Sequence, residues 1–158
     1  IGSGSKFLID KKIVDESLLE KEESDEINYL AYGDARENRG KEQIGGVILN
    51  SIIDLTHPLA FGYENNTLPL YKNNSIWLKP SKNSYSSVVR YTDDSLIDGF
   101  LSENNKSKIK ESVSLVVSKV GKGIAVMFAD NPNFRGAWYG TNRLFLNAIL
   151  LGDKIDIP

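Results

Sequence analysis

The densest group of residues able to do chemistry follows an apolar run near the end of the sequence. Asp130, Asn133 and Arg135 lie directly after Ile124–Ala129 (IAVMFA). In open α/β sheets, ligands bind beyond the carboxyl ends of strands. Arg135 is therefore a candidate anion clamp, Asp130 its orienting carboxylate and Asn133 a further ligand-binding candidate. Asp130 and Arg135 can also pair with each other and close the loop, because structural ion pairs imitate functional ones. We favour that structural interpretation.

A second candidate for ligand binding is His57, which is the single histidine of the chain. A catalytic or metal-binding imidazole usually works with a second His or a Cys. The sequence has no cysteine, so it predicts neither a thiolate nucleophile nor a metal site within this chain. Next to Pro58, a hydrogen-bonded loop histidine is the interpretation we favour. Ser3 and Ser5, in the opening IGSGS, lack the pattern around a serine nucleophile and are interpreted as part of a Gly-rich turn.

The elements that must position these residues are a hairpin, a loop and a helix. Gly121-Lys122-Gly123 predicts a tight turn, because glycine accepts a positive φ. The apolar run Ile124–Ala129 predicts a strand covered on both faces, as in a sheet between helices. Asp130–Tyr139 has the composition of a loop. Thr141 is the predicted N-cap of a helix over Asn142–Leu151.

The rest of the chain predicts short strands and one further helix. Residues 11–44 form a polar excursion with few apolar anchors, and charge runs such as KEESDE are usually solvated. Ser102 is expected to cap a helix over Glu103–Ser112. The β-branched and apolar runs that predict strands are 47–54, 67–71, 75–78, 87–91 and 113–119.

Size and composition limit the classes of protein that fit. A chain of 158 residues, 41% of them hydrophobic, is enough for a single domain with its own core. The net charge is −2 and no basic block is present, which argues against a nucleic-acid partner. No apolar run approaches the roughly 20 residues of a membrane-spanning helix.

Several segments resemble one family of domains. The chain is similar to the C-terminal class I glutamine amidotransferase-like domain of large secreted bacterial zinc carboxypeptidases, which belong to the carboxypeptidase A-like metallopeptidases. DNPNFRGAWYGTN is its most specific part. The segments that carry the resemblance are GKGIAVMFADNPNFRGAWYGTNRLFLNAIL, IDLTHPLAFGY, LKPSKN, RYTDDS and the opening IGSGSKFL.

The resemblance implies an α/β, flavodoxin-like fold with a mainly parallel sheet flanked by helices. It also implies a single domain over 1–158 that is a fragment, with its first strands upstream of Ile1. A sheet cut at that point would expose apolar edges, so we expect a neighbouring chain to cover it, either another subunit or the excised N-terminal part. The resemblance also implies the upstream peptidase domain of the same polypeptide as a partner. The position of the family's nucleophile falls on Gly or Ser here, which excludes glutaminase chemistry by a thiolate.

The function that this implies is a non-catalytic accessory domain of a secreted or periplasmic zinc carboxypeptidase. The zinc and the peptide-cleaving residues would lie upstream, and this chain would hold no cofactor of its own. The alternative is a ligand-binding or hydrolase-like amidotransferase relative that acts through the 130–135 loop.

Overall fold

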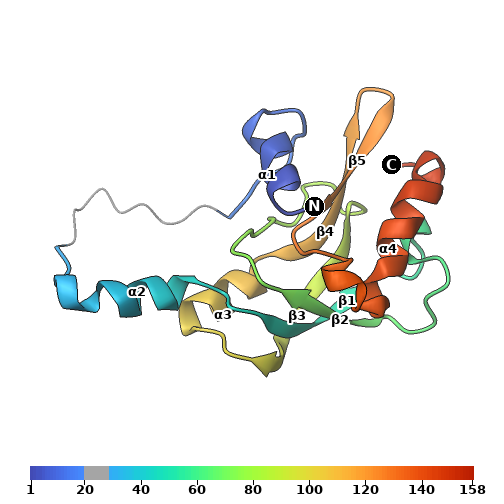
Figure 1. Cartoon of the computed structure of the whole chain (residues 1–158). Helices are drawn as coiled ribbons and strands as arrows, with labels where there is room; N and C mark the ends of the chain where they lie inside the picture. The colour runs from blue at the N-terminus through green and yellow to red at the C-terminus, as the bar shows by residue number, and fades with distance from the viewer. Residues whose placement is uncertain (20–28) are drawn as a thin grey trace.

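The computed structural model describes residues 1–19 and 29–158. Within them, five strands form one sheet in the order β2-β1-β3-β4-β5, and each neighbouring pair is antiparallel. The sheet curls into a half-barrel (Figure 1). The strands are β1 (Val47–Ile53), β2 (Thr67–Lys72), β3 (Ser87–Gly99), β4 (Val113–Val120) and β5 (Gly123–Phe128).

The antiparallel sheet shows that the predicted flavodoxin-like, mainly parallel fold is wrong. Burial of β5 on both faces suggested a parallel sheet, but that burial depends on the layers around a strand and not on its direction. The connection between the predicted strands 87–91 and 113–119, which includes the predicted helix, is also long enough for a parallel crossover. In the structure it connects β3 to β4 as antiparallel neighbours.

Helices lie around the sheet without forming regular crossovers. The α-helices are α1 (Ser3–Asp10), α2 (Ala35–Glu42), α3 (Glu103–Lys110) and α4 (Tyr139–Leu150). Short 3-10 turns are η1 (Tyr32–Asp34), η2 (Pro58–Ala60), η3 (Phe134–Gly136) and η4 (Gly152–Lys154). Figure 1 shows the β4–β5 hairpin between α1 and α4, whereas α2 extends away from the sheet and buries none of its residues.

The helix boundaries test the predicted caps. Ser102 is the N-cap of α3, because its Oγ accepts a hydrogen bond from the Asn105 N–H at 3.2 Å. The cap predicted at Thr141 is wrong, since α4 begins at Tyr139. Thr141 is instead buried inside the first turn and donates from its Oγ1 to the Pro132 carbonyl at 2.6 Å.

The core lies on both faces of β4 and β5. On one face, Val126 and Phe128 pack with α4 residues such as Leu144. On the other face, Ala125 and Met127 pack with residues of α1 and of the segment after it. β5 therefore alternates between two hydrophobic clusters, which accounts for its continuous apolar sequence.

Two segments differ from their sequence-based predictions. The expected strand 75–78 is reduced to isolated bridges at Leu78, which pairs with Leu18 and Val113. The expected strand 87–91 continues to Gly99 as β3, with an irregular register opposite β1. Of the polar excursion 11–44, residues 20–28 lie outside the described residues.

Candidate functional site

A buried ion pair joins the two edge strands of the curled sheet. Lys72 ends β2, and Asp130 follows β5 at the opposite edge. The Lys72 Nζ lies 3.0 Å from Asp130 Oδ1, and the two side chains are 0% and 5% exposed. β2 alternates buried and exposed positions, and Lys72 shares its buried face with Leu68 and Leu70. A lysine at such a position needs a nearby anion, which Asp130 supplies.

Hydroxyl groups from the central strands complete the surroundings of this carboxylate. The Tyr91 hydroxyl, from β3, donates to Asp130 Oδ2 at 2.5 Å, and Ser114 Oγ, from β4, donates to the same oxygen at 2.8 Å. Both oxygens of Asp130 are therefore occupied by groups of the protein. We call Lys72, Tyr91, Ser114 and Asp130 the buried polar cluster.

The lysine also has further partners of its own. Its Nζ donates to the Ile76 carbonyl at 2.8 Å and to Asn74 Oδ1 at 3.4 Å. It lies 4.4 Å from the ring centroid of Trp77. Charge, hydrogen bonds and an aromatic face together compensate for the loss of water around the ammonium group.

The protonation states follow from burial and from the pair itself. Burial lowers the pKa of the Lys72 ammonium, and the Asp130 carboxylate opposes this shift by its charge and its hydrogen bond. Burial, followed by the negative charge of Asp130, raises the pKa of the Tyr91 phenol well above its ordinary value. Tyr91 therefore keeps its proton and acts as a hydrogen-bond donor. The cluster has the character of a closed structural network.

The structure separates Arg135 from Asp130. Among the described residues, the ion pair of Asp130 is with Lys72, so the predicted pairing with Arg135 is wrong. Arg135 adopts the left-handed conformation, with φ 52°, and its guanidinium carbon lies 5.2 Å from the ring centroid of Phe134. Asn133 is partly buried, and its N–H donates to Asn131 Oδ1 at 3.0 Å. Asp130, Asn133 and Arg135, which are close together in the sequence, therefore make separate contacts in the structure.

The loop that carries these residues covers the edge of β2. Phe134 stacks on Tyr71 with their ring centroids 3.9 Å apart. The Trp138 Nε1 donates to the Pro69 carbonyl at 3.2 Å. The cavity between this loop and the cluster is only about 10 Å³, the smallest space that holds a single water. A substrate cannot reach Asp130 without movement of the loop.

His57 and Ser5 also make internal contacts. The Nδ1 of His57 accepts a hydrogen bond from the Leu59 N–H at 3.1 Å and so caps η2. Burial lowers the pKa of His57, against the opposing charge of Asp54. Ser5 is buried and donates to the Phe128 carbonyl at 2.9 Å. Neither side chain lies among the residues around Asp130.

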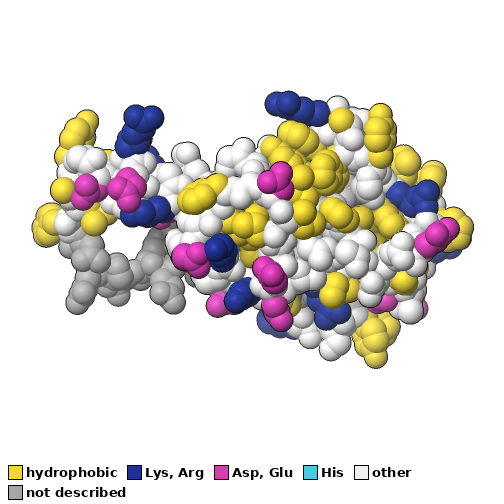
Figure 2. Space-filling view, turned by 90° about the horizontal axis from the view of Figure 1, so that it is seen from below, with side chains coloured by type: hydrophobic (Ala, Val, Ile, Leu, Met, Phe, Trp, Pro, Cys, Tyr) yellow, Lys and Arg dark blue, Asp and Glu magenta, His cyan; other side chains and the backbone are white. Residues whose placement is uncertain are grey.

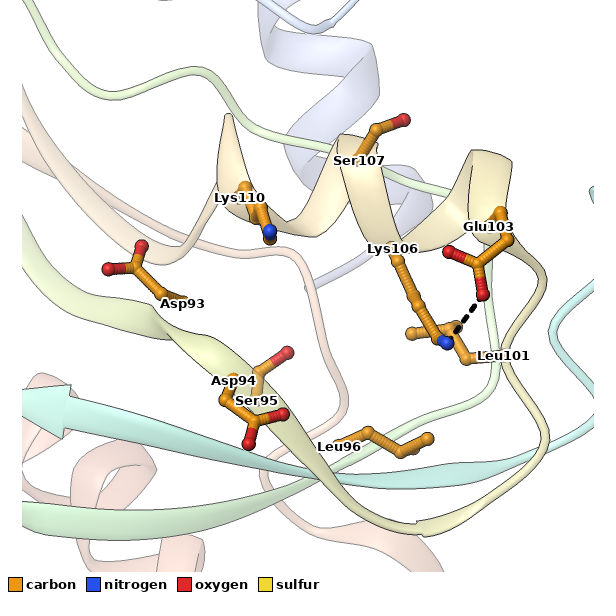
Figure 3. A pocket seen from close by; sticks show the side chains of 9 residues that line it. All are labelled: Asp93, Asp94, Ser95, Leu96, Leu101, Glu103, Lys106, Ser107 and Lys110. Carbon is orange, nitrogen blue, oxygen red and sulfur yellow. Dashed lines mark hydrogen bonds and ion pairs between the residues drawn. The ribbon is translucent and has the colours of Figure 1, made fainter.

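An open pocket of about 390 Å³ lies between β3 and α3 (Figure 3). Asp93 and Asp94 come from the irregular part of β3, and Lys106 and Lys110 come from α3. Figure 3 shows the Ser95 hydroxyl directed into the space between the strand and the helix. This arrangement can hold a small polar molecule that carries both signs of charge.

Wider surface features agree with this mixed charge. Figure 2 shows Lys and Arg side chains interspersed with Asp and Glu side chains on the face seen from below. Among residues 1–19 and 29–158, no group of three or more His, Cys, Asp or Glu side chains gathers to hold a metal ion. In the same residues, no helix is both long and apolar enough to cross a membrane.

The sequence pattern singles out Asp130 as a candidate but does not predict its partners Lys72, Tyr91 and Ser114. The signal for Lys72 was present: TLPLYK alternates with a period of two, and this places the lysine on the same face as Leu68 and Leu70. No local signal connects Tyr91 or Ser114 with Asp130, because only the order of the strands brings them together.

No family model, no curated protein and no solved structure matches this chain.

Proposed function

We propose that this chain is a non-catalytic accessory domain of a secreted or periplasmic zinc carboxypeptidase. The zinc and the residues that cleave the peptide lie in a peptidase domain upstream on the same polypeptide. The family part of the proposal is supported by the resemblance of DNPNFRGAWYGTN and IDLTHPLAFGY to such domains. The non-catalytic part is supported by the geometry around Asp130.

The non-catalytic role rests on one observation, the burial and the hydrogen bonding of the Asp130 carboxylate. Its carboxylate is 5% exposed and accepts hydrogen bonds from Lys72, Tyr91 and Ser114. An acid, base or nucleophile must reach the reacting atom of a substrate within hydrogen-bonding distance. A carboxylate surrounded by the protein's own donors instead stabilises the sheet that carries it. No observation favours the alternative, hydrolase-like chemistry at the 130–135 loop.

The test is to recover the protein from its source with an antibody against this chain and to assay the precipitate. We expect carboxypeptidase activity that a zinc chelator abolishes and added zinc restores. The purified chain of 158 residues serves as the matched control and should cleave no peptide with zinc present. A precipitate that contains the chain without a zinc-dependent peptidase contradicts the family part. Turnover by the isolated chain, lost on Asp130→Asn, contradicts the non-catalytic part.

A further inference from the structure

The two edges of the sheet are protected very differently. At the β2 edge, Pro69 lacks an N–H and its outward carbonyl is bonded by Trp138. Tyr71 on the same edge lies under Phe134. Proline and a covering loop are devices by which natural sheets prevent their edges from pairing with other chains. Among the residues that the structure describes, the β5 edge has neither a proline nor a loop of this kind.

The outward groups of β5 can be assigned from the ladder. The Ala129 N–H donates to the Ser114 carbonyl, so Ala129 faces β4. The Phe128 carbonyl accepts the Gly2 N–H at 2.7 Å, so Phe128 faces outward. Because the direction alternates along an antiparallel strand, Ile124 and Val126 also direct their N–H and C=O groups outward. Within the described residues, neither of them has a hydrogen-bond partner at this edge.

The rest of the edge is well suited to pairing. At the end of this edge, the Phe128 carbonyl accepts hydrogen bonds from the Gly2 N–H, just before α1, and from Ser5 Oγ within α1. GIAVMF has no charged residue, and charges on an edge strand are a usual defence against association. The positive charges of the hairpin, Lys119 and Lys122, lie at or near its turn. Figure 1 shows that this hairpin projects beyond the body of the sheet.

We propose that the β5 edge binds the β5 strand of a second copy of this chain, in antiparallel orientation about a two-fold axis at Ala125. In this register Ile124 faces Val126 of the other copy. Their outward N–H and C=O groups then bond each other on both sides of the axis. The result is one continuous sheet through both copies. This inference does not depend on the proposed function.

A second copy is favoured because the strand is complementary to itself. On one face, Ile124 meets Val126, which forms a β-branched apolar pair of the kind that stabilises sheets. On the other face, Ala125 meets its own counterpart without a charge or a large side chain. At a two-fold axis, the same residue from both copies meets itself. A charged residue at position 125 would therefore face a like charge. Gly123–Phe128 has none.

The first experiment is sedimentation of the full chain at micromolar concentrations, with Val126→Pro as the test variant. Proline at 126 removes an outward N–H and leaves the ladder to β4 intact. Loss of the hydrogen bonds on both sides of the axis should weaken dimerisation by at least about 30-fold. The matched control is Thr67→Pro, at an outward position of the covered β2 edge, which should leave dimerisation unchanged. Thermal melting of both variants shows whether each is folded.

The second experiment tests the register and does not depend on tolerance of proline. The chain has no cysteine, so Ala125→Cys introduces a single thiol at the proposed axis. Residues facing each other at such a non-hydrogen-bonded position have Cα atoms about 4.5 Å apart, which a disulfide can bridge. We expect rapid oxidation to a covalent dimer, and none for Thr67→Cys. A wild-type monomer at 100 µM overturns the proposal, as does a dimer that resists Val126→Pro and fails to cross-link at position 125.

Discussion

Replacing Lys72 by methionine tests the buried polar cluster most directly. Methionine has nearly the same length and keeps the packing, but it removes the positive charge beside Asp130. The carboxylate then keeps Tyr91 and Ser114 as donors and loses its counter-ion at 3.0 Å. Removing one partner of a buried ion pair typically costs about 3–5 kcal/mol of unfolding free energy. We expect a loss in this range.

The double variant separates the charge from the packing. Lys72→Met with Asp130→Asn leaves no buried charge, and the Asn carbonyl can still accept from Tyr91 and Ser114. Replacing both partners of a buried pair is often neutral or stabilising. We therefore expect the double variant to recover most of the stability lost by Lys72→Met, which corresponds to a large coupling free energy in a double-mutant cycle.

Urea unfolding followed by circular dichroism provides the measurement. With a slope of about 2 kcal/mol per M, the single variant should lower the midpoint by about 2 M. Lys106→Met is the matched control, because Lys106 pairs with Glu103 in solvent, with side chains 43% and 89% exposed, and surface pairs contribute little. If Lys72→Met shifts the midpoint no more than Lys106→Met does, the reasoning about the buried pair is refuted.

Other predictions concern Arg135 and His57. Arg135 adopts φ 52° and makes no pair with Asp130. Because a Cβ atom is strained at this φ and glycine has none, the Arg135→Gly variant should have an unfolding free energy about 1 kcal/mol higher than that of Arg135→Ala. Equal melting temperatures of the two variants would contradict this. The folded-state pKa of His57 is lowered below 6.5 by burial, so the unfolded chain binds the proton first as the pH falls. The stability that the neutral imidazole contributes is present above pH 6.5 and is lost as the pH falls toward the folded-state pKa. His57→Gln should therefore lose less stability than the wild type between pH 7.5 and 5.5 in urea unfolding, and identical losses would contradict the assignment.

The sequence predicts elements much better than it predicts their arrangement. The predicted turn at Gly121 and the predicted strand after it are both present in the structure, because the glycine and the apolar run determine the structure locally. Ser102 was also correct, since a cap depends on only a few residues. The direction of neighbouring strands depends on contacts between distant segments. The predicted parallel sheet therefore failed although most of its strands exist.

The candidate site shows the same difference between local features, which the sequence predicts, and long-range contacts, which it does not. The position of Asp130 after an apolar run makes it a ligand-binding candidate, and the structure places its carboxylate in a buried ion pair. Its partner was assigned to Arg135 because that residue was close in sequence. The true partner, Lys72, is 58 residues away and is brought near by the curl of the sheet. Nearness along the chain was thus a poor guide to which charges pair.

The separation of Lys72 from Asp130 has a consequence for the order of folding. β2 is synthesised before β5, and Asp130 follows β5. Before β5 docks, burial of Lys72 would leave its ammonium group without a counter-ion, which costs free energy. A partly assembled sheet is therefore not expected to close over Lys72. Closure must wait for contacts across a long loop, which slows folding. A nascent chain that ends before residue 130 should therefore keep this face open, and the half-barrel should form in one late, cooperative step.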